Sequence, residues 1–230
     1  MNKKKLSLIF FWTVVTIHLS GHLFDLEVHS VSKPLIIISL LIYFLVSVSE
    51  RSKLFYMTII ALFMSWLGDV FLMFDVQDSL FFIFGLASFL IAHVTYVFSY
   101  RVAKNQTADN PLLSSQKLRH GSTLVLAGLA LVYVLEPGLG DMKLPVIVYA
   151  SVIVIMAITA LLRYGYTSIQ SFALVFGGAI MFMISDSLLA VNKFLNVFSY
   201  SGFWIMLTYC LAQFLIVKCI INNINTKKMK

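Results

Sequence analysis

Two aspartates stand inside long apolar runs of the sequence, Asp69 after Gly68 and Asp186 after Ser185. An aspartate in a membrane helix is costly, so it normally faces a partner, the bundle interior or a water-filled cavity. Both are expected about five residues inside the outer ends of helices that run in the same direction, and hence at matched depth. Two such carboxyl groups could divide acid and anion roles, one staying protonated and the other ionised. The alternative is structural, with each carboxylate pairing with a nearby lysine or polar group.

Two lysines are candidates for binding an anionic part of a substrate. Lys33 and Lys193 are two of the three cations expected on the outer side of the membrane. Either could bind a phosphate or pair with an aspartate. Lys193 could equally extend its ammonium group to the membrane interface.

Three further polar residues complete the candidate substrate-binding set. His93 and Tyr96 lie in one apolar run, and we expect His93 roughly 20 Å from the outer end of its helix, well below the aspartates. A packed, hydrogen-bonded role for His93 stays open. Gln213 is expected to form a hydrogen bond between helices.

The sequence predicts neither a metal nor a cofactor. His18 and His22 share a helix face at a spacing of four residues, but no third ligand accompanies them. No phosphate loop, nucleophile elbow or dinucleotide fingerprint is present. The chemistry therefore rests on carboxyl groups.

The composition indicates whether water or lipid surrounds most of this chain. Of 230 residues, 60% are hydrophobic and 12% are charged, whereas soluble domains have about 25% charged residues. A chain this short cannot hide so much apolar surface from water, which excludes soluble and disordered proteins. The continuous apolar runs also exclude an outer-membrane barrel, whose strands alternate in polarity.

The apolar runs predict an all-α polytopic membrane helix bundle. Most of them reach the roughly 20 residues that a spanning helix needs. We expect one integral membrane domain over residues 1–230, with about eight transmembrane helices at residues 6–24, 34–48, 54–74, 80–100, 122–135, 144–162, 169–191 and 198–221.

The loop charges predict the orientation of this bundle. If eight helices alternate in direction, 14 of the 17 lysines and arginines fall on one side. The positive-inside rule then places both termini in the cytoplasm of a multi-pass cell-membrane protein. Because the cations occupy short loops and form no basic face, we expect no nucleic-acid partner.

An offset of 117 residues aligns Asp69 with Asp186 and Gly85 with Gly202. Each half would then contain four helices, as in a parallel 4+4 internal repeat. Two aligned positions are as compatible with coincidence as with a true duplication.

Taken together, these residues resemble the YhhN family of lysoplasmalogenase-like membrane proteins. The matching pieces come in the family's order and cover most of the chain: Lys33-Pro34, Ser65-Trp66-Leu67-Gly68-Asp69, Gly85 to Ala92-His93-Val94-Thr95-Tyr96, Ser185-Asp186-Ser187-Leu188-Leu189-Ala190, and Tyr209 to Ala212-Gln213-Phe214-Leu215-Ile216. The resemblance implies a multi-pass fold. It also implies cleavage of the vinyl ether of lysoplasmalogens to a fatty aldehyde and a glycerophospho-ethanolamine or -choline.

Three functions stay open. The first is a hydrolase in which Asp69 and Asp186 share the acid and anion roles, with a lysophospholipid substrate drawn from membrane lipid. The second is a small transporter or lipid-binding protein without hydrolytic activity, suggested by acidic residues at corresponding positions of the repeat. The third is a structural membrane protein. The oligomeric state is not predicted.

Overall fold

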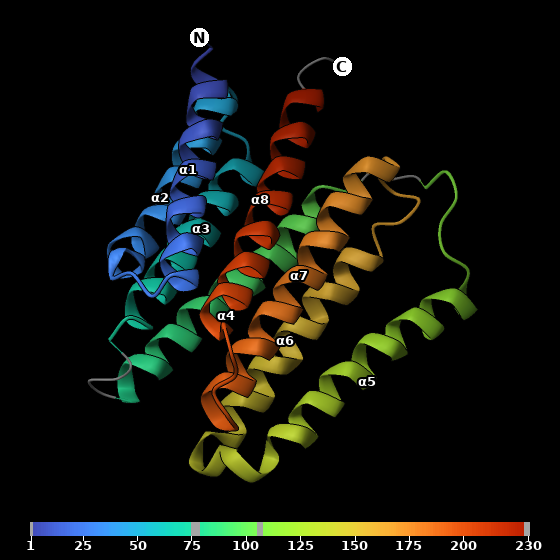
Figure 1. The fold of residues 1–230 in the computed structure, drawn as a ribbon. Coiled ribbons are helices and arrows are strands. Elements are labelled where there is room, and N and C mark those ends of the chain that lie inside the picture. The colour runs from blue at the N-terminus through green and yellow to red at the C-terminus, as the bar shows by residue number, and fades with distance from the viewer. Residues whose placement is uncertain (1, 75–78, 105–107, 228–230) are drawn as a thin grey trace. The chain divides into compact units, whose positions relative to one another are not determined.

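The computed structural model describes residues 2–74, 79–104 and 108–227, and all regular secondary structure in these ranges is helical. The helices are α1 (Lys3–Leu23), α2 (Val28–Ser47), α3 (Lys53–Phe71), α4 (Ser79–Val102), α5 (Ser114–Leu139), α6 (Lys143–Leu161), α7 (Ile169–Phe194) and α8 (Ser201–Lys227), with a short 3₁₀ helix η1 (Gly140–Met142) between α5 and α6 (Figure 1). The predicted all-α membrane fold is confirmed.

Seven helical stretches of the described chain are long and apolar enough to cross a membrane. This number is close to the predicted eight, because α5, η1 and α6 form one continuous stretch, Ser114–Leu161. Their outward faces carry large exposed apolar side chains, for example Leu126 and Leu129 on α5. Such faces are stable only against lipid or another apolar surface.

The chain separates into two compact units. The N-terminal unit contains Met1–Ser99 and Ile220–Lys230, and the central unit contains Tyr100–Cys219. Whether they make one domain, and whether the chain is an internal repeat, stay predictions.

In the N-terminal unit, α1 and α2 form a hairpin. A Cβ atom on Gly21 would lie 3.0 Å from Cβ of His29, so the two helices approach closely at their connection. Asp25, in the connection, has a φ of 53°, a left-handed conformation that aspartate tolerates better than most residues. At the other end of α2, Asn225 Nδ2 of α8 donates to the Ser47 carbonyl at 3.1 Å.

Helix α2 begins six residues earlier than predicted. The sequence indicated a start at Pro34, because proline suits the first helical turn. The structure instead starts α2 at Val28 and places Pro34 inside the helix. Proline inside a helix removes the N–H that would bond one turn back and crowds the carbonyl there, but the rest of the helix continues around it. Just before Pro34, Ser32 Oγ donates to the Val28 carbonyl at 2.8 Å.

In the central unit, α5 and α6 form a second hairpin. Gly140, with a φ of 47°, occupies a backbone conformation that glycine adopts easily. A Cβ on Gly138 would overlap the carbonyl of Phe194, so the C-terminal ends of α5 and α7 touch. Figure 1 shows α5 diverging from α6 and α7 toward its N-terminus.

Helix α5 is longer than the predicted 122–135 segment at both ends. It extends from Ser114 to Leu139 and passes through Pro137. Its first turns are polar, so hydropathy alone could not include them. The connection between α4 and α5 is correspondingly shorter than the gap between the predicted segments, and its residues 105–107 lie outside the described chain.

Arg163, just beyond α6, is fully buried. Its guanidinium donates to the Tyr100 carbonyl at 3.0 Å and to Ser171 Oγ at 2.9 Å, and lies 3.9 Å from Cys219 Sγ. Burial lowers the pKa of Arg163, while Cys219 and Tyr100 act to raise it. Because the Tyr100 carbonyl is in the last turn of α4, Arg163 places a cation at the negative end of that helix.

Candidate functional site

Asp186 is held by a tyrosine that the sequence did not indicate. The Tyr149 hydroxyl on α6 donates to Asp186 Oδ2 on α7 at 2.6 Å. This is the short distance of a hydrogen bond to a charged acceptor. On the same helix, Ser185 Oγ donates to the Ile205 carbonyl of α8 at 3.0 Å. Asp186 therefore lies where α6 and α7 pack together, one residue from a contact to α8.

A small cavity adjoins this hydrogen bond. Its volume is about 30 Å³, and Tyr149, Asp186 and Ser187 contribute to its lining together with apolar side chains of α5, α6 and α7. A volume of roughly 10–15 Å³ accommodates one water, provided that polar partners are present. Apolar atoms make up nearly all of the lining, so the cavity is large enough for a water but offers it few polar partners.

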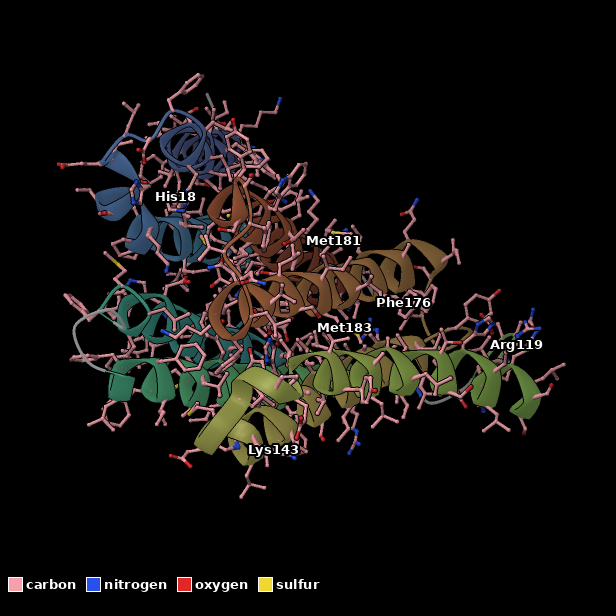
Figure 2. The ribbon with its side chains drawn as sticks, turned by 60° about the horizontal axis from the view of Figure 1, so that its bottom comes forward. His18, Arg119, Lys143, Phe176, Met181 and Met183 are labelled. Carbon is pink, nitrogen blue, oxygen red and sulfur yellow. The ribbon has the colours of Figure 1, made fainter. Side chains whose placement is uncertain are left out.

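A groove opens beside this cavity, between α5 and α7. It has a volume of about 340 Å³, and its lining includes Thr123 and Ala127 of α5 and Ile180 and Ser187 of α7. Met183 lines both the groove and the cavity. Figure 2 shows Met183 on the side of α7 that faces α5. We call this feature the α5–α7 groove.

Asp69 lies in the last turn of α3 and is 2% exposed. The preceding residue brings α3 against α4, because a Cβ on Gly68 would lie 2.6 Å from the ring of Phe89. One turn further on, a Cβ on Gly85 would lie 2.8 Å from Leu72. The two glycines thus allow the close helix approach at which Asp69 is buried.

The same contacts fix the depth of His93 relative to Asp69. Gly68 opposite Phe89 and Leu72 opposite Gly85 define an antiparallel register in which His93 lies level with residue 64. His93 is therefore about 7.5 Å from Asp69 along the helix axis, toward the N-terminal end of α3. His93 and Tyr96 are both fully buried.

Lys33 lies beside a group of histidines at the α1–α2 connection. His18 and His22 are near enough to its ammonium group to interact with it electrostatically. The ring centroids of His18 and His22 are 4.9 Å apart, and those of His22 and His29 are 4.8 Å apart. His18 Nδ1 also lies 2.9 Å from Ser32 Oγ. In the described part of the chain, no three histidine, cysteine or acidic residues are arranged to hold a metal.

The remaining candidates lie in the central unit. Lys193 is in the last turn of α7, not beyond it, because α7 extends to Phe194 and past the predicted end at residue 191. A cation there suits the negative end of the helix. Gln213 is fully buried, and its Nε2 donates to the Tyr209 hydroxyl one turn earlier on α8, at 3.3 Å.

The two units divide the candidate residues. The N-terminal unit holds Lys33, Asp69, His93 and Tyr96, whereas Asp186, Lys193 and Gln213 belong to the central unit. The pairing of the two aspartates stays a prediction.

Sequence reasoning missed Tyr149, because a tyrosine in a long apolar segment is most simply interpreted as a packed core residue. Its only signal in the sequence is that a buried tyrosine hydroxyl needs a hydrogen-bond partner.

A family model describes most of this chain. The YhhN family model matches residues 28–220. The chain belongs to the YhhN family. The match begins at the start of α2 and ends in α8, so it includes all seven candidate residues. No solved structure matches the chain.

The matched residues begin after α1. His18 and His22 therefore lie outside the match, whereas His29 and Lys33 lie inside it.

Proposed function

We propose that this protein is a membrane hydrolase that cleaves the vinyl ether bond of a lysoplasmalogen, giving a fatty aldehyde and a glycerophospho-alcohol. Membership of the YhhN family supports the proposal, as do the lysoplasmalogenase-like motifs of the sequence. The observation that carries it is the Tyr149–Asp186 hydrogen bond beside a cavity of water size.

Vinyl ether hydrolysis needs an acid, an anion and a water. A proton is added to the vinyl carbon that is not bonded to oxygen, and the other vinyl carbon becomes an oxocarbenium ion. Water attacks that carbon and loses a proton, which gives a hemiacetal. The hemiacetal then breaks its bond to the glycerol oxygen, which takes a proton, and the aldehyde is released. Carboxyl groups perform corresponding acid and anion roles in glycosidases.

The hydrogen bond from Tyr149 supports the anion role for Asp186. Tyr149 donates its hydrogen to Asp186, and an ionised carboxylate is the better acceptor for such a donor. Asp186 is therefore proposed as the anion that stabilises the cation and accepts the proton of the water. Asp69 is then the proton donor.

Substrate chemistry tests this proposal. Purified protein in detergent is incubated with three lysophospholipids that share head group and chain length: the vinyl ether, the saturated alkyl ether and the acyl ester. We expect aldehyde from the vinyl ether alone, because the alkyl ether has no carbon to protonate. In heavy water the aldehyde should carry one deuterium on the carbon next to the carbonyl.

Two outcomes would contradict the proposal. Fatty acid released from the ester with no aldehyde from the vinyl ether would indicate a lysophospholipase. Binding of all three lipids without any product would indicate a lipid-binding or transport protein.

A further inference from the structure

The α5–α7 groove and the cavity at Asp186 adjoin each other along the contact between α5 and α7, which we call the seam. On α5, the groove is lined by Thr123 and Ala127, and the cavity by Gly128 in the next position. On α7, Met183 and Ser187 line both. A ligand that occupies the groove therefore lies next to the cavity that Asp186 lines.

We propose that the α5–α7 groove binds the single hydrocarbon chain of the lysolipid whose ether bond lies at Asp186, and that the chain enters sideways from the membrane. This proposal rests on the proposed function and adds to it the place of the substrate's chain. The groove volume of about 340 Å³ is at the lower end of the roughly 300–1,000 Å³ of small-molecule sites. It suits one chain better than the two chains of a membrane phospholipid.

Helix packing explains why the seam is open along the groove and closed at its far end. The C-terminal ends of α5 and α7 touch at Gly138 and Phe194. There, Leu135 and Leu139 form a buried cluster with Val146. Toward its N-terminus α5 diverges from α7 (Figure 1), and the small side chain of Ala127 does not fill the space between them. The open side exposes the seam to the hydrocarbon of the membrane.

The order of groups along α7 matches the order of groups in a lysolipid. Ile180 in the groove precedes Asp186 by six residues, a rise of about 9 Å, and the side chains between them are mostly apolar. A hydrocarbon chain followed by an ether bond therefore meets an apolar groove and then a carboxylate.

Photolabelling tests the groove without requiring turnover. The probe is a lysophospholipid with a diazirine in the middle of its chain, added to the purified full-length protein. We expect labelled peptides from residues 123–127 and 180–188. Ala127→Phe fills the groove and should lower labelling at least about tenfold, since hydrophobic pockets discriminate by 10–200-fold per methylene. Ala130→Phe is the matched control on α5, because Ala130 is exposed and lines neither space.

Three results would overturn the proposal: labels confined to other helices, equal loss of labelling in Ala127→Phe and Ala130→Phe, or displacement of the probe by an equal amount of two-chain phospholipid. An aldehyde assay on the same samples separates this proposal from the proposed function. Groove labelling without aldehyde release refutes the hydrolase and supports the groove. Aldehyde release with labels elsewhere refutes the groove alone.

Discussion

Removing the Tyr149 hydroxyl is the most direct test of the Asp186 site. Tyr149→Phe keeps the ring and deletes the donor that lies 2.6 Å from Asp186 Oδ2. A hydrogen bond to a charged group contributes about 1.5–3 kcal/mol. If that energy stabilises the transition state, turnover falls about 10- to 160-fold, at 1.36 kcal/mol per decade. The hydrogen bond is only partly buried, so we expect the lower end of this range.

A double-mutant cycle decides whether Tyr149 acts through Asp186. Initial rates of aldehyde release are measured for the parent, Tyr149→Phe, Asp186→Asn and the double variant. The second substitution should cost little once the first is present, because residues that act as a unit are not additive. Tyr133→Phe is the matched control, since Tyr133 on α5 is 82% exposed.

Two results would refute the reasoning about Tyr149. Equal losses from Tyr149→Phe with and without Asp186 would show that Tyr149 acts elsewhere. Turnover of Tyr149→Phe within about twofold of the parent would show that the hydrogen bond has only a packing role, since surface or packing changes of that size are ordinary.

Four further outcomes are expected. Asp69→Asn and Asp186→Asn should each lower turnover at least about a hundredfold while the protein stays folded in detergent, as for loss of a general acid or its partner; activity within threefold of the parent would make the residue structural. Activity should survive chelators, because the mechanism uses only carboxyl groups, and loss that zinc restores would overturn it. Arg163→Met should lower the free energy of unfolding by about 3 kcal/mol, because it leaves buried acceptors without their donor, and unchanged denaturation in detergent would contradict this. Reporter fusions at Asp109 and Asp141 should report the cytoplasm and the opposite side, respectively, and the reverse result would invert the predicted topology.

The sequence predicted the number and placement of helices well, because spanning a membrane requires long apolar runs. It predicted their ends poorly. Pro34 suggested a helix start, yet α2 begins at Val28, since proline inside a helix removes one donor and the other bonds continue. Ser114 begins α5 although its surroundings are polar. Hydropathy shows which residues can lie in the hydrocarbon of a membrane. The ends of a helix depend instead on where its backbone hydrogen bonds stop.

The candidate site was predictable only in part. Asp69 and Asp186 stand out in a sequence because buried carboxylates are costly in apolar surroundings. Tyr149 does not stand out, because its ring counts as apolar in a hydropathy profile. The partner of its hydroxyl, Asp186, lies on another helix and is visible only in the structure. The groove was equally hidden, because it arises from the divergence of two helices that are remote in sequence.

An entrance that faces hydrocarbon changes what concentration means for this protein. A ligand that enters the α5–α7 groove comes from a two-dimensional solution, so its saturation depends on its mole fraction among the lipids and not on its amount per volume of buffer. Diluting a fixed number of ligand molecules with inert detergent should then lower occupancy even in an unchanged volume. In a cell, membrane composition would then set the occupancy of the groove directly.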